Sequence, residues 1–218
     1  MTAESERILE LVAAGQLTPA EADTLLRRLD ERERHRLRSW FLDPVEGLGT
    51  ARAVALGLLV FAGAFAAAPL GLRFDGALDL HLVSGPVSWT TALGDFVLAG
   101  PLVGVVLWLA TLVVARRGRF VDHFAAVGLS RIPSLLAGLV ILGARALATP
   151  GQELPLTLSI AVAFARVLGL VGQVTLLFRG YRLASGLRGI RLVLTLLVAL
   201  VAAETLSILA LRALGTER

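Results

Sequence analysis

The stretch GLSRIPSLLAGLVILGARALA, residues 128–148, is apolar along most of its length, yet it contains Arg131 and Arg145. About 20 residues of α-helix cover roughly 30 Å, which is the thickness of the hydrocarbon core of a bilayer. A guanidinium stays protonated in proteins, so an arginine cannot enter hydrocarbon by losing its charge. The stretch therefore predicts a membrane helix in which both arginines need a polar partner or a route to water.

The composition of the whole chain indicates the same surroundings. Of the 218 residues, 56% are hydrophobic and 17% are charged. A soluble domain usually carries about 25% charged residues, so this chain has more apolar surface than its own core would bury. A lipid bilayer accepts such surface. The chain contains no Cys, which excludes disulfides and thiolate chemistry.

Five apolar runs follow a polar N-terminal segment. Each run has about 20 residues or more, enough for a membrane helix, and none shows the alternation of a transmembrane β-strand. We predict an all-α polytopic membrane protein in which residues 41–218 form a five-helix transmembrane bundle. The expected spans lie near residues 53–72, 96–115, 124–148, 156–178 and 189–211.

The arginines predict the orientation of this bundle. Seven of them lie between the second and third spans or around the start of the fifth, whereas the loops on the opposite side contain only Arg73. The positive-inside rule then puts the N-terminus in the cytoplasm and the C-terminus outside. We expect the protein to lie in the cell (inner) membrane. Residues 73–95 become an outer loop, in which ALDLHLVSG (77–85) alternates like a strand of a small hairpin. The seven are Arg116, Arg117, Arg119, Arg179, Arg182, Arg188 and Arg191.

Residues 1–40 predict a cytoplasmic helical hairpin. Gly15 suits the end of a first helix, and Thr18, Pro19 and Glu21 form a capping box with its preferred proline. The piece AAGQLTPAEADTLL resembles the SHOCT-like hairpins found at the ends of many bacterial membrane proteins. Such a hairpin is either a docking module, for a cytoplasmic partner or a second copy, or a solvated cap. Acids interleave with the bases of residues 30–40, so no nucleic-acid partner is expected.

Three segments resemble the bacterial branch of the Yip family. They are FLDPVEGL before the first span, RGRFVDHFAAVGLSRIPSLLAGL entering the third and RGYRLASGLRGIRLVLTLLVALV entering the fifth. The resemblance covers about residues 40–212 and rests on the order and spacing of weak motifs. It implies five spans, a cytosolic N-terminus and a scaffold or trafficking-type adaptor. The Rab/Ypt GTPase partners of the eukaryotic members would not be expected in a bacterium.

The charges inside the spans are the candidate functional residues. Arg131 lies about 10 Å inside the cytoplasmic face, where it could snorkel or take a carbonyl freed by the kink at Pro133. Arg166 in the fourth span and Glu204 in the fifth have nearly the same predicted depth, which favours a pair. That pair is either a buried ion pair that registers two helices or part of a polar track for an ion, substrate or lipid head group.

Small and polar residues extend the candidate site. Ser159, Gly169 and Gln173 lie in a stripe with Arg166 at helical spacing, which indicates a face that contacts another helix. Gly100 and Gly104 have the GxxxG spacing of close helix contacts, although this spacing arises readily by chance in a glycine-rich chain.

No catalytic constellation is present in the sequence. His35, His81 and His123 lie in three separate polar segments and are interpreted as solvated surface residues. The chain lacks HExxH, a phosphate-binding glycine loop and GxSxG. We therefore expect a non-catalytic membrane scaffold or adaptor without a cofactor or metal, which recruits a partner through its hairpin. The alternative is a transporter or lipid-translocating protein that uses the Arg166 and Glu204 region.

Overall fold

The structure is a computed structural model that describes residues 3–42, 48–74, 76–78, 80–83, 85–147 and 155–213. The chain divides into two compact units, Met1–Leu42 and Asp43–Arg218.

The first unit is the predicted helical hairpin. Helix α1 (Ala3–Ala13) and helix α2 (Pro19–Leu42) are joined by a turn in which Gly15 has φ +69°. The capping box is confirmed, because Thr18 Oγ1 accepts from the backbone N–H of Glu21 and Glu21 Oε2 accepts from the backbone N–H of Thr18 at 2.9 Å. That backbone bond and a second one from the Thr18 hydroxyl lower the pKa of the Glu21 carboxyl.

The second unit is all-α, with a two-stranded ladder as its described sheet, and five of its described helical stretches are long and apolar enough to cross a membrane. These stretches agree with the predicted spans, but most of them begin before the apolar runs because polar residues and turns extend the helices. Their bounds are Thr50–Leu70, Trp89–Ala115, Phe120–Leu147, Leu156–Ser185 and Gly189–Ala213.

Three of the spans are built from more than one helical segment. The first consists of α4 (Thr50–Ala67) and the 3₁₀ turn η1 (Ala68–Leu70). The second runs through α5 (Trp89–Val97), the π-helical turn η2 (Leu98–Leu102) and α6 (Val103–Ala115). The third is α7 (Phe120–Ser130) followed by α8 (Ile132–Leu147). The fourth and fifth spans are the single helices α9 (Leu156–Ser185) and α10 (Gly189–Ala213).

Proline accounts for both interior irregularities. Pro101 lies inside η2, and Pro133 lies in the first turn of α8, directly after the break at Arg131. Proline has no N–H to donate and its ring crowds the preceding turn, so the backbone of a helix departs from α geometry around it. Both breaks lie within spans, where the backbone carbonyls need donors other than water.

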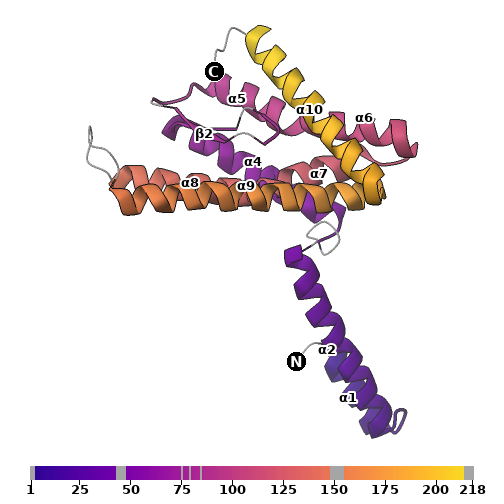
Figure 1. Cartoon of the computed structure of the whole chain (residues 1–218). Coiled ribbons are helices and arrows are strands. Elements are labelled where there is room, and N and C mark those ends of the chain that lie inside the picture. The colour runs from indigo at the N-terminus through magenta and orange to yellow at the C-terminus, as the bar shows by residue number, and fades with distance from the viewer. Residues whose placement is uncertain are drawn as a thin grey trace. The chain divides into compact units, whose positions relative to one another are not determined.

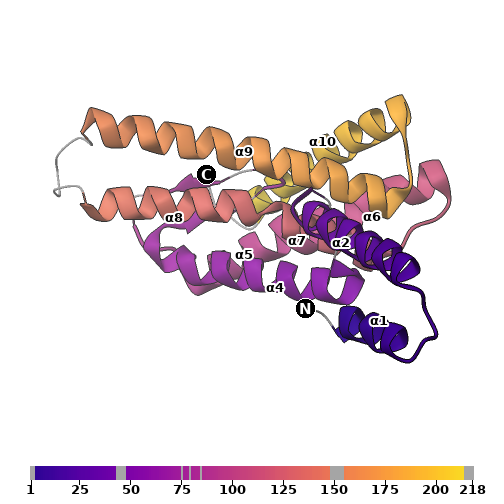
Figure 2. The same ribbon diagram turned by 90° about the horizontal axis from the view of Figure 1, so that it is seen from below.

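Close backbone contacts hold the bundle together. Helix α9 runs beside α8, with which it is antiparallel, and beside α7 (Figures 1 and 2). Helix α4 crosses α7 where Gly57 faces Gly128, and a Cβ built on Gly128 would lie only 2.6 Å from Cα of Gly57. This contact needs glycine on both helices, as at other small-residue interfaces of membrane proteins.

The segment after the first span differs from the predicted outer loop. Strand β1 (Leu72–Arg73) pairs antiparallel with β2 (His81–Leu82), so the segment forms a small strand hairpin, as predicted. Between the strands, however, Phe74, Gly76 and Ala77 are buried, and Ala77 belongs to the main hydrophobic core. The loop therefore folds back into the bundle, where side chains from three spans form hydrogen bonds with its backbone N–H and C=O groups.

Two arginine-rich turns meet at one end of the second unit. The guanidinium of Arg117 lies over Gly186, with Nη2 3.0 Å from the place where a Cβ of Gly186 would be. The α6–α7 turn therefore lies against the α9–α10 turn, as a membrane protein with hairpin-connected spans requires. Here Arg119 forms an ion pair with Asp122, whose carboxylate raises the pKa of the Arg119 guanidinium.

Cysteine labelling tests the span count and the predicted orientation. On this Cys-free chain, Arg117→Cys and Arg188→Cys should react with a membrane-impermeant maleimide from the cytoplasmic side only. Gly85→Cys should react only from outside, since the strand hairpin lies at the other end of the first span and Gly85 has open space around it. Labelling of positions 117 and 85 from the same side would contradict an odd number of crossings between them.

Candidate functional site

Arg131 is at the centre of a buried polar cluster. Its side chain is 1% exposed, and it lies at the break between α7 and α8. Nη2 donates to three backbone carbonyls: those of Gly76, of Ala77 at 3.1 Å and of Ala99 at 2.9 Å. The guanidinium also lies 5.6 Å from the ring centroid of Phe74, a cation–π distance. Arg131 is therefore too buried to snorkel, and these three carbonyl acceptors do not include one freed by Pro133. Arg131 binds the loop that folds back into the bundle.

Gln173 and Ser134 hold the same loop from α9 and α8. Gln173 is 1% exposed, and its Nε2 donates to the carbonyl of Ala77 at 3.1 Å. Ser134 donates to Oε1 of Gln173, which orients the amide toward the loop. The carbonyl of Ala77 thus accepts from both Arg131 and Gln173.

Glu204 binds the other side of the loop from α10. Its Oε2 accepts from the backbone N–H of Ala77 at 3.0 Å. The same oxygen would lie 2.6 Å from a Cβ built on Gly76, so a larger residue there would have to displace the carboxylate of Glu204. We call Arg131, Ser134, Gln173 and Glu204 the loop-anchoring cluster. Four helices contribute to it or border it. Arg131, Gln173 and Glu204 bind the peptide units of residues 76 and 77, and Arg131 also binds the carbonyl of Ala99.

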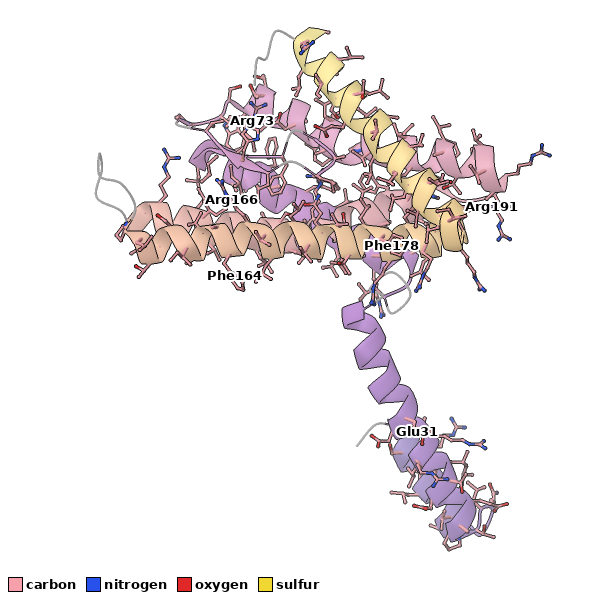
Figure 3. The ribbon with its side chains drawn as sticks, in the orientation of Figure 1. Glu31, Arg73, Phe164, Arg166, Phe178 and Arg191 are labelled. Atoms are coloured by element: carbon pink, nitrogen blue, oxygen red, sulfur yellow. The ribbon has the colours of Figure 1, made fainter. Side chains whose placement is uncertain are left out.

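Arg166 is not part of this cluster. Its side chain is exposed, and Figure 3 shows it on the upper side of α9, with Phe164 on the lower side. An exposed Arg166 does not fit the predicted buried ion pair with Glu204, whose carboxylate contacts Ala77. Equal predicted depths place two residues at one level of the membrane, but the rotation of each helix decides which faces meet.

The predicted polar stripe divides along α9. Gly169 and Gln173 are buried against α8, where a Cβ on Gly169 would lie 2.7 Å from that of Ala137. Ser159 is half-buried near the start of the helix. Pro133 contacts the next small residue of α9, Gly172. The small residues therefore serve close packing of α9 on α8, and one polar residue of the stripe, Gln173, enters the loop-anchoring cluster.

Gly100 and Gly104 both lie at helix contacts. A Cβ on Gly100 would lie 2.8 Å from the ring of Phe61 in α4, and one on Gly104 would lie 3.4 Å from Cα of Phe124 in α7. The second span therefore packs through these glycines against two different helices of the same chain.

Two further buried polar groups were not singled out from the sequence. The first is the ion pair of Arg73 and Asp95, in which Nε and Nη2 donate to the two carboxylate oxygens at 2.9 and 2.8 Å. Both side chains are buried, although both residues fall in the predicted outer loop. Their opposite charges were the available signal, but a separation of 22 residues gives no spacing rule for such a pair.

The second group is a Thr–His–Tyr network near the arginine-rich end. Thr111 Oγ1 lies 2.9 Å from Nε2 of His123 and 3.0 Å from Oη of Tyr181, and Nδ1 of His123 donates to the carbonyl of Arg119. All three side chains are buried. The interpretation of His123 as a solvated residue is therefore wrong. The side chain of His35 lies outside the described residues, and His81 is half-buried in β2.

The comparisons with known proteins do not assign the chain to a group. No family model, curated protein or solved structure matches it. The Yip-like and SHOCT-like resemblances therefore continue to rest on the quoted segments. Within the described ranges, no three His, Cys, Asp or Glu side chains lie together as a metal ion would need.

A double-mutant cycle tests whether Arg166 pairs with Glu204, as predicted from the sequence, or is exposed without contact to it. We expect Glu204→Leu to lower the free energy of unfolding by about 1–3 kcal/mol, because it leaves the buried N–H of Ala77 without its acceptor. Arg166→Leu should cost less than about 0.5 kcal/mol, as for other exposed sites. The two changes should then be additive, to be measured by unfolding in detergent. A coupling energy above about 1 kcal/mol would support the predicted ion pair of Arg166 and Glu204.

Proposed function

We propose that this chain is a non-catalytic integral membrane scaffold or adaptor, of the kind that the Yip-like segments imply, and that it recruits a partner through its helical hairpin. The observation that carries the proposal is that the side chains of the loop-anchoring cluster form hydrogen bonds within the protein. Arg131, Ser134 and Gln173 are almost completely buried, and their hydrogen bonds go to the chain's own backbone and to one another. Polar side chains that hydrogen-bond within the protein stabilise a fixed structure, which supports a scaffold more than a path for a substrate.

The hairpin supports the recruiting part of the proposal. It is a compact unit of its own, with its own capping box and turn. Leu9 and Leu25 remain 46% and 36% exposed on it. Two short helices bury little apolar area, so a partner that covers these leucines would add the missing stabilisation. A cytoplasmic location for the hairpin is supported by the arginine distribution, and the inner membrane of a bacterium by the family resemblance; both are part of the proposal.

Site-specific photocrosslinking in intact membranes tests this function. A photoreactive residue at Leu25 should give one discrete adduct, whereas one at Asp23, on the opposite face of α2, should give none. The adduct is then identified as a second copy or as another protein. Deletion of residues 1–38 should abolish partner binding and leave the five spans inserted. Equal adducts at both positions, or failure of the truncated chain to insert, would overturn the proposal.

One observation favours a second candidate, a lipid-translocating protein. An open groove of about 440 Å³ lies between α10 and the loop, and Glu204 is its charged lining residue beside Ala77, Leu78, Leu197, Leu200 and Val201. In vesicles that contain this protein and a fluorescent phosphatidylcholine, translocation would let dithionite bleach both leaflets, and Glu204→Gln would slow it. Bleaching of the outer leaflet alone, as in protein-free vesicles, would exclude this candidate.

A further inference from the structure

A groove opens at the arginine-rich end of the bundle, where α9 turns into α10. Its volume is about 700 Å³. Its apolar wall consists of Phe178, Leu183, Leu192 and Val193, and Arg182 and Arg188 line its outer part. Figure 3 shows Phe178 and Arg191 at this end of the two helices. Phe178, Leu192 and Val193 thus lie farther from the α9–α10 turn than Arg188, and Leu183 lies beside Arg182 near the end of α9.

Positive charge is concentrated around the groove. Arg182 and Arg188 are exposed, and the guanidinium of Arg117 lies over Gly186, which also lines the groove. The chain from residue 178 to residue 193 contains no Asp or Glu. Arg182 and Arg188 thus line one opening, and the guanidinium of Arg117 lies beside a glycine of its lining. An anion is the complementary charge, and guanidinium groups bind phosphate through paired hydrogen bonds.

The position of the groove narrows the class of anion. Helix α9 ends at Ser185 and α10 begins at Gly189, so the arginines lie at the level where a span leaves the hydrocarbon. An apolar wall directly below them suits an acyl chain, which a soluble anion lacks. The same end carries the arginines that the positive-inside rule assigns to the cytoplasmic leaflet, in which anionic lipids attract basic residues.

We propose that this groove binds an anionic phospholipid, with the headgroup phosphate held by Arg182 and Arg188 and an acyl chain lying along Phe178 and Val193. The site is independent of the proposed adaptor function, because its lining residues lie between Phe178 and Val193 and none belongs to the loop-anchoring cluster.

Binding of short-chain lipids to the full-length protein in dodecyl maltoside tests the proposal, with bound lipid counted by native mass spectrometry. Dioctanoyl-phosphatidylglycerol should bind at least tenfold more tightly than dioctanoyl-phosphatidylcholine. The double variant Arg182→Gln/Arg188→Gln should weaken this binding about 30-fold, since each basic residue near a lipid surface contributes about 1 kcal/mol. Arg212→Gln, an exposed arginine at the other end of α10, is the matched control and should leave binding unchanged.

A second variant separates a built groove from diffuse attraction. Val193→Trp keeps every charge but fills the apolar wall at a partly exposed position, and it should weaken binding of the anionic lipid about tenfold. Normal binding by this variant would mean that the arginines act only as a charged surface, and it would overturn the proposal. Displacement of the lipid by an equal concentration of inorganic phosphate would overturn it as well, as would equal affinity for the two lipids.

Discussion

Arg131→Leu should lower the free energy of unfolding by about 3–5 kcal/mol, the largest loss that we expect from a single side chain of this protein. The change removes a charged donor from the carbonyls of Gly76, Ala77 and Ala99. A hydrogen bond to a charged group contributes about 1.5–3 kcal/mol, and a buried carbonyl that loses its donor is costly where no water replaces it. Reversible unfolding of the full chain in mixed detergent and dodecyl sulfate would measure the loss.

Arg145→Leu is the matched control in the same span. The side chain of Arg145 is exposed, and its one described hydrogen bond goes to the carbonyl of Val83 at 3.0 Å. We expect a loss below about 1 kcal/mol. Similar losses for the two variants would mean that the three carbonyl contacts of Arg131 contribute little and that the loop is held mainly by apolar packing of Phe74 and Ala77.

Gly128→Ala should destabilise the bundle by about 2–3 kcal/mol, although it adds a single methyl group. The new Cβ would lie 2.6 Å from Cα of Gly57 and 3.1 Å from its carbonyl carbon. Both are backbone atoms of a long helix, so relief requires α4 and α7 to move apart along their whole contact. Overpacking of this kind costs about 1–3 kcal/mol and occasionally more. The melting midpoint in dodecyl maltoside gives the measurement.

Gly143→Ala should have the opposite sign. Gly143 lies in α8, and a Cβ built on it meets no atom within 4 Å. Alanine should therefore stabilise the helix by about 0.5–1 kcal/mol, because it loses less backbone entropy than glycine. If both glycine variants shift the midpoint in the same direction, the effect reflects helix propensity, and the close contact of α4 and α7 is not limiting.

The sequence singled out most residues of the loop-anchoring cluster but not their hydrogen-bond partners. Arg131 and Glu204 were singled out because charged groups in a span need partners, and Gln173 because it lies in a stripe of small and polar residues. The structure brings these three together on residues 76 and 77, whereas the sequence had matched Glu204 with Arg166 by depth. Depth follows from counting residues along each helix. The choice of partner depends on helix rotation and on a loop whose burial no local pattern indicates.

The sequence by itself determined the number of membrane-spanning helices, the hairpin with its Thr18 cap and the placing of the arginine-rich turns at one end. These features depend on residues that are close together in the chain. A continuous apolar run enters lipid, a helix end is capped by its own residues, and successive turns alternate between the two sides of the membrane. Only the tertiary structure decided that Arg131 anchors a buried loop, that Arg166 is exposed and that Gly57 meets Gly128. Those contacts join residues far apart in the chain, and they depend on how side chains and backbones from several helices fit into one volume.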